Sequence, residues 1–216
     1  MSTIPLTASY TIVRGLLVPL LLTANGFCGE SRVDDLQKRA ERFTGDTKDS
    51  RVETLAKNSQ TVMQAIETSG KTLIAAYGAL DLDTCLNPGT ATPEQLKKAG
   101  PGVAAFRDAA QAFGAATVQH RRHVVAELDR QKLAVAGTPR AEADSGFDLA
   151  LKWAEGGLRL ADTAVSALKS FKTETPADPQ HSKNVLAAAE SYEAAYDALA
   201  AHRDRRQKRM DQILPR

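Results

Sequence analysis

The sequence has few aromatic side chains, few cysteines and almost no net charge. Phe, Trp and Tyr make up 5% of the 216 residues, whereas β-sheets favour aromatic and β-branched residues. The formal net charge is +2, so no global field attracts the chain to nucleic acid, and we expect no nucleic-acid partner. These scarcities favour an all-α protein whose helices pack closely.

Motifs of catalysis are missing too. The sequence contains no G-x-S-x-G, no Walker glycine loop, no H-E-x-x-H and no C-x-x-C-H, so common hydrolase, nucleotide, zinc-protease and covalent-haem signatures are absent. A nucleophilic cysteine needs a lowered pKa. Cys85 is expected near a helix C-terminus, where the dipole opposes a thiolate, and Asp81 and Asp83 fit a polar helix end. We therefore expect no enzymatic activity and no resident cofactor.

The first 26 residues have the outline of a secretory signal peptide. Residues 1–14 carry one cation, Arg14, and no acid; an apolar run follows at 15–22, and Ala24 and Gly26 suit a cleavage site. The run is short for a transmembrane helix, which needs about 20 apolar residues. We expect an exported, periplasmic or secreted protein, with an uncleaved membrane anchor or a buried N-terminal segment as alternatives.

Cys28 lies just after this segment, in a lead at 27–49 that includes a short predicted helix at 31–43. A lipid-anchored bacterial protein has its modified cysteine at this place, but Asn25, Gly26 and Phe27 fit such a site poorly. An ordinary thiol is favoured over lipidation. Pairing with Cys85 is disfavoured, because a helix starting near Arg51 would carry Cys85 about 50 Å away.

Residues 50–216 contain four long helical patterns. Apolar residues recur at steps of three and four, the spacing of one helix face. The predicted buried stripes are Val52, Leu55, Val62, Ile66, Leu73, Tyr77 and Leu80; Val103, Phe106, Ala110, Phe113, Thr117, Val124, Leu128 and Val135; Phe147, Leu151, Ala154, Leu158, Ala161, Val165 and Leu168; and Val185, Ala189, Tyr192, Tyr196 and Leu199, continuing to Met210 and Ile213.

Glycine and proline set the predicted helix boundaries. The first long helix is expected over 50–86, ended by the turn at 87–89, and a brief helix follows the Thr92 cap, with Pro93 and Gln95 behind it. Gly100-Pro101-Gly102 should stop or kink that brief helix before the central one at 102–136. Similar signals open helices near 138–139 and 178–179. Matched lengths and short links predict an antiparallel up-down four-helix bundle.

Two glycines, Gly156 and Gly157, fall inside the third predicted helix. Together they cost about 2 kcal/mol relative to alanine. We interpret them as a place of close helix contact rather than as a hinge.

His120, His123 and Glu127 are three and four residues apart on the central helix, and so share a face. Such a set can bind zinc or another transition metal if a facing helix adds a ligand, and Glu67, Glu155 and Asp197 are expected near that level. A haem held by His120 and Met63 is a related alternative. The simpler interpretation is a half-buried His120 beside a solvated His123 and Glu127.

The densest basic run lies near the C-terminus. Its cations are Arg203, Arg205, Arg206, Lys208 and Arg209. A solvated helix end explains the run, since cations suit a helix C-terminus; an anionic membrane surface or an acidic partner are sharper alternatives.

We therefore expect an exported cell-envelope bundle that binds a protein partner, or another copy of itself, through helix packing. The alternatives are a metal- or haem-binding bundle that uses His120, and a bundle active at membrane surfaces.

Overall fold

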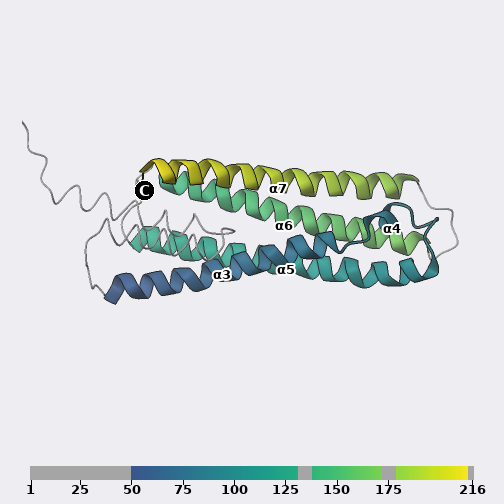
Figure 1. Cartoon of the computed structure of the whole chain (residues 1–216), viewed down its shortest axis with the longest axis horizontal. Coiled ribbons are helices and arrows are strands. Elements are labelled where there is room, and N and C mark those ends of the chain that lie inside the picture. Colours follow the sequence, from purple (N-terminus) through teal and green to yellow (C-terminus); the bar gives the residue numbers. More distant parts are fainter. Residues whose placement is uncertain (1–49, 131–137, 172–178, 214–216) are drawn as a thin grey trace, which may run out of the picture. The chain divides into compact units, whose positions relative to one another are not determined.

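The computed structural model describes residues 50–130, 138–171 and 179–213. Every regular element in these ranges is an α-helix (Figure 1), which confirms the all-α prediction for this part of the chain. The expected signal peptide at 1–26 and the lead at 27–49 lie outside the described residues, as does Cys28. No helix within the described ranges has both the length and the apolar content that crossing a membrane requires.

The elements are α3 (Ser50–Gly78), α4 (Leu82–Leu86), α5 (Pro93–Arg130), α6 (Thr138–Phe171) and α7 (Pro179–Ile213). The predicted helix starts near 93, 138 and 179 are confirmed. At the start of α5, Thr92 N–H donates to Gln95 Oε1 at 2.8 Å and Gln95 N–H donates to Thr92 Oγ1 at 3.3 Å. This reciprocal pair is the capping box that the sequence predicted.

The prediction of one helix over 50–86 is wrong. The helix ends at Gly78, and Asp81 opens the short α4. Its carboxylate accepts hydrogen bonds from the backbone N–H of Thr84 at 3.0 Å and from Thr84 Oγ1 at 2.6 Å. Asp81 is therefore an N-cap. The apolar spacing hid this break, because Leu80 continues the stripe across it and is itself buried.

The predicted stop at Gly100-Pro101-Gly102 is also wrong, since α5 continues through Pro101. Proline inside a helix costs about 3 kcal/mol, partly because one carbonyl loses its donor. That carbonyl belongs to Lys97, and both Lys97 and Pro101 are exposed, so water can reach it. Val103 and Phe106, fully buried just beyond, offset the cost by their packing.

The chain divides into two compact units. Each of the four long helices contributes residues to both. Within the described ranges, the first unit takes residues 50–67, 118–130, 138–147 and 201–213, and the second unit takes 68–117, 148–171 and 179–200.

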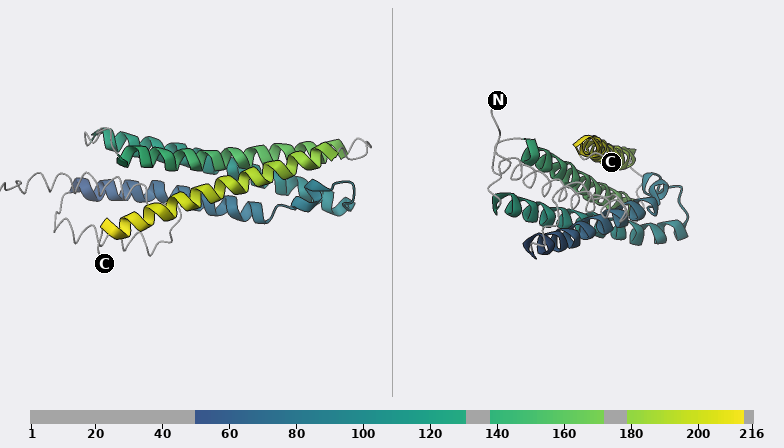
Figure 2. Two further views of the ribbon diagram at one scale, coloured as in Figure 1. Left: turned by 90° about the horizontal axis from the view of Figure 1, so that it is seen from above. Right: turned by 60° about the vertical axis from the view of Figure 1, so that its left-hand side comes forward.

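The second unit has an aromatic core. Tyr192 lies at its centre, with ring centroids 4.7 Å from Tyr77, 5.4 Å from Phe106 and 5.8 Å from Trp153. Trp153 extends the cluster to Phe113 at 4.7 Å and to Tyr196 at 5.2 Å. These side chains come from α3, α5, α6 and α7, so the few aromatic residues of the chain join all four long helices in this unit. The helices lie side by side there in two further views (Figure 2).

Two neighbouring glycines bring α6 close to its partners within this unit. A Cβ at Gly157 would lie 3.0 Å from Cβ of Ala110 on α5, and one at Gly156 would lie 3.3 Å from Cα of Tyr192 on α7. A methyl group at either position would collide with the neighbouring helix or press tightly against it. The prediction that these glycines mark close helix contact is confirmed.

The predicted stripes of α5 and α7 are buried at most described positions: Val103, Phe106, Ala110, Phe113, Thr117, Val124, Val185, Ala189, Tyr192 and Leu199. On α3, Ile66 and Leu73 are buried.

The stripe predicted for α6 is confirmed in part. Phe147, Ala154, Ala161 and Leu168 are buried, whereas Leu151, Leu158 and Val165 are half-buried. The buried face is wider than the predicted stripe and also includes positions that alternate by three and four: Ala150, Trp153, Gly157, Leu160, Ala164 and Ala167. This helix is apolar over a wide arc, so periodicity alone could not fix the centre of its inward face.

Replacing Gly157 by alanine tests the close contact. Gly157→Ala should lower the free energy of unfolding by about 1 to 2 kcal/mol, because overpacking against Ala110 outweighs the better helix propensity of alanine. Gly78→Ala is the matched control, since a Cβ there meets nothing within 4 Å; it should leave stability unchanged or raise it. Urea unfolding followed by fluorescence of the single tryptophan, Trp153, measures both. A Gly157→Ala protein as stable as the parent would contradict the argument.

Candidate functional site

His120 lies in the interior of the first unit. Its side chain is 3% exposed, and its ring centroid lies 5.3 Å from that of Phe147 on α6, in an edge-to-face arrangement. The sequence placed His120 at the edge of the stripe and half-buried. The structure places it inside.

Of the other members of the predicted metal set, only His123 has a described side chain. His123 is half-buried, and its Nε2 is buried with no hydrogen-bond partner among the described residues. Glu127 belongs to α5 and Met63 to α3, but neither side chain is described. Within the described part of the chain, no three His, Cys, Asp or Glu side chains are grouped to hold a metal ion. The metal and haem alternatives stay predictions.

The carboxylates expected near His120 separate into two environments. Glu67 is buried in the first unit, whereas Glu155 and Asp197 are exposed and belong to the second unit.

A third histidine of the first unit, His202 on α7, packs against α6. A Cβ at Gly146 would lie 3.1 Å from His202 Nε2. Gly146 directly precedes Phe147, the residue that contacts His120. Nothing in the sequence marks His202 as a half-buried residue that contacts another helix, because it lies far along the chain from His120 and His123 and begins a basic run.

The basic run has an inner and an outer side. Arg203 and Arg206 are half-buried, whereas Arg205 and Lys208 are exposed. Arg209 lies within α7, but its side chain is not described.

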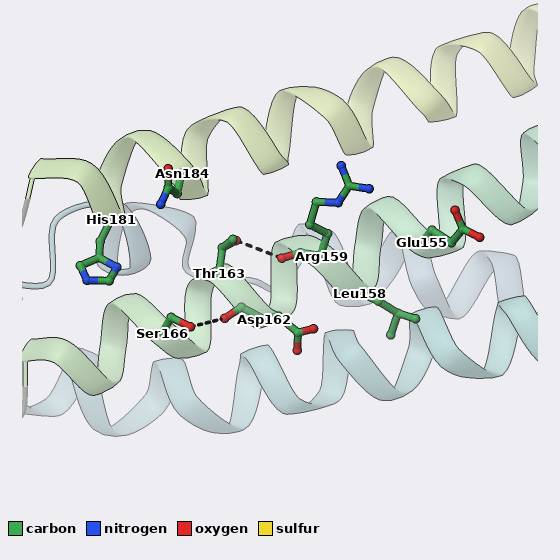
Figure 3. A pocket seen from close by; sticks show the side chains of 8 residues that line it. All are labelled: Glu155, Leu158, Arg159, Asp162, Thr163, Ser166, His181 and Asn184. Carbon is green, nitrogen blue, oxygen red and sulfur yellow. Dashed lines mark hydrogen bonds between the residues drawn. The ribbon is translucent and has the colours of Figure 1, made fainter.

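The second unit contains a groove between α6 and the first turns of α7, with a volume of about 630 Å³. Figure 3 shows its lining: six residues come from α6, and two come from α7. They are Glu155, Leu158, Arg159, Asp162, Thr163, Ser166, His181 and Asn184. All but Leu158 are polar, and the groove is open to solvent.

Some groove side chains are already engaged. Asp162 forms an ion pair with Arg107 at 3.2 Å, and the hydroxyl groups of Thr163 and Ser166 donate to carbonyls of their own helix at 2.9 to 3.1 Å. Those two hydroxyl oxygens keep acceptor capacity. Glu155 and Arg159, one turn apart, make no ion pair within the described part of the chain, so the groove presents both signs of charge.

Sequence reasoning missed this groove. Glu155, Arg159, Asp162 and Ser166 recur at steps of four, three and four on α6. The spacing is visible, but it indicates only a solvated helix face. Nothing in the sequence pairs that face with His181 and Asn184 on α7.

Comparison with known proteins does not identify a relative. No protein-family model matches the chain, and neither a curated protein nor a solved structure matches it.

Cys85 is a free, fully buried thiol within α4. Burial, and secondarily the charge of Asp81, raises its pKa to about 11. A raised pKa is the opposite of what a nucleophilic cysteine needs, as the sequence argument anticipated.

Because this thiol is buried, we expect the free energy of unfolding to fall at alkaline pH. In the unfolded chain the thiol ionises with a pKa near 9.0, whereas the folded protein holds the proton until about pH 11. The folded state therefore binds more protons between these values, and its stability falls as pH rises from 9 toward 11, by at most about 2 to 3 kcal/mol.

Urea unfolding at stepped pH values measures the effect in a Cys28→Ser background. Burial also raises the pKa of Tyr77 and of Tyr192 above the usual range, which adds a loss of the same sign above pH 10. Cys85→Ala should therefore abolish the decline between pH 9 and 10 and keep the later one. If the Cys85→Ala protein lost stability between pH 9 and 10 as steeply as the parent, the assignment of this loss to Cys85 would be refuted.

Proposed function

We propose that this chain is a non-catalytic helical module of the cell envelope that binds a protein partner, or a second copy of itself, through the groove between α6 and α7. The observation that supports this function most is the groove itself, an open polar cleft on closely packed helices. The outline of a signal peptide at 1–26 supports export.

We also propose that the four long helices form an antiparallel up-down bundle. The support comes from contacts in the second unit. Along α5 and α6, Arg107 meets Asp162 whereas Ala110 lies opposite Gly157, so numbers rise on one helix as they fall on the other. Gly156 with Tyr192, and Trp153 with Tyr196, give the same reversal for α6 and α7.

The lining suits a protein segment that carries both polar and apolar groups, because the polar side chains stand beside exposed aliphatic carbon. Glu155 and Arg159 offer opposite charges one helical turn apart, and Asn184 offers an amide donor and acceptor. Side chains as exposed as these contribute little affinity individually. A partner would be selected by contacting several of these side chains at once. We expect its binding to be modest in affinity and reversible.

Site-specific photo-crosslinking in the native host tests the groove. A p-benzoylphenylalanine introduced at Asn184 should give a discrete covalent adduct, because that position lines the groove. The same group at Glu190, also exposed on α7 and about 120° around the helix, should give none. The adduct mass distinguishes a second copy from a different protein.

A charge exchange provides the second control. Glu155→Arg combined with Arg159→Glu keeps the net charge. It should remove the adduct formed from position 184 if the groove recognises charged groups of its partner. Equal adducts at positions 184 and 190, or none at either, would refute the proposal.

A metal- or haem-binding bundle is the second candidate function. Two observations favour it: His120 is buried in the first unit, and Nε2 of His123 is buried without a hydrogen-bond partner among the described residues. Elemental analysis and an absorbance spectrum of the purified mature protein, with intact mass on the same sample, separate the two candidates. Under the binding proposal the protein should be colourless and metal-free, and His120→Gln should keep the Asn184 adduct. About one equivalent of metal, or a Soret band, lost in a folded His120→Gln protein, would favour the second candidate.

A further inference from the structure

We infer that the outer face of α7 over residues 203–209, here called the basic end, docks reversibly on an anionic phospholipid surface. This inference concerns the first unit and does not depend on the groove of the second.

The basic end presents two of its described cations outward, Arg205 and Lys208. Arg205 and Lys208 are three residues apart, so they share a face of α7, and both are exposed. Neither makes an ion pair with any residue that the structure describes. Asp204 is the exposed acid between the arginines.

Two of the three acids described in the first unit are engaged or hidden elsewhere. Glu67 is buried, and Asp144 is engaged by Arg121 at 3.1 Å. The third, Asp204, lies four residues before Lys208 and offsets part of the positive charge of this face. Among the side chains described in this unit, six cations stand against three acids. The cations are Arg121, Arg122, Arg203, Arg205, Arg206 and Lys208, and the acids are Glu67, Asp144 and Asp204.

The second unit has the opposite balance. Its described side chains include eight cations and ten acids, and two of its cations are held in ion pairs, Lys98 with Glu94 and Arg107 with Asp162. The small net charge of the whole chain therefore conceals a basic first unit. An anionic partner would be attracted to the first unit and not to the second.

The packing of this helix end argues for docking at headgroups rather than insertion. His202 packs against Gly146, so the inner side of that turn is occupied by α6. Only the polar outer face is available, and it carries no large apolar side chain at positions 203–209. Each exposed Lys or Arg near an anionic membrane strengthens binding by only several-fold, so binding should be weak and sensitive to salt. The predicted export places anionic phospholipid headgroups within reach.

Vesicle sedimentation with the full mature chain tests this inference. The protein should pellet at low salt with vesicles of phosphatidylcholine and phosphatidylglycerol in a two-to-one ratio, stay in the supernatant with pure phosphatidylcholine, and be released by high salt. Arg205→Glu combined with Lys208→Glu should weaken binding by roughly tenfold or more.

Lys152→Glu combined with Lys183→Glu is the matched control. It makes the same change in net charge at exposed positions on α6 and α7 of the second unit, and should keep most of the binding. Three outcomes would each overturn the inference. The protein could fail to pellet with anionic vesicles, both double variants could lose vesicle binding equally, or binding could be the same at low and high salt. Binding to soluble polyglutamate without pelleting would also overturn it, in favour of an acidic protein. The Asn184 adduct of the groove should survive Arg205→Glu with Lys208→Glu, so the two proposals fail separately.

Discussion

The close approach of α6 to α5 and α7 at Gly156 and Gly157 is the constraint on which the second unit depends. Because glycine has no side chain, the Cβ of Ala110 and the backbone of Tyr192 can approach α6 very closely. A methyl group on either glycine would crowd these neighbours. This proximity brings Tyr192 into ring contact with Phe106, Tyr77 and Trp153. Six aromatic side chains suffice for this core, because they converge on one place in the second unit.

The same packing places polar side chains of the second unit beside hydrogen-bond partners. Tyr77 satisfies its hydroxyl group by donating to Glu193 at 2.6 Å, and Thr117 donates to the carbonyl of Phe113 at 2.8 Å. These two hydroxyl groups are thus used structurally. The same helix, α6, carries small residues inward and the charged groove residues outward, so the groove's α6 wall is held by the close contact behind it.

The first unit has a different interior. Its described buried side chains include a carboxylic acid, Glu67, and an imidazole, His120, beside Ile66, Val124 and Phe147. Buried groups of this kind carry a desolvation cost that neighbours must offset. Together with the outward cations of α7, they make this unit polar inside and basic outside. Two candidate binding surfaces of different chemistry therefore lie on different units of one chain.

Periodicity and caps in the sequence determined the all-α class, the Thr92 capping box, the inward faces of α5 and α7, and the meaning of the glycine pair, because these are local or depend only on helical spacing. Only tertiary structure decided the rest. Pro101 does not end a helix, since buried neighbours and water access outweigh local preference there. The inward face of α6 is wider than the predicted stripe, because both α5 and α7 pack closely against it. His120 is buried, and the groove exists, because packing juxtaposes residues that no spacing within one helix could relate.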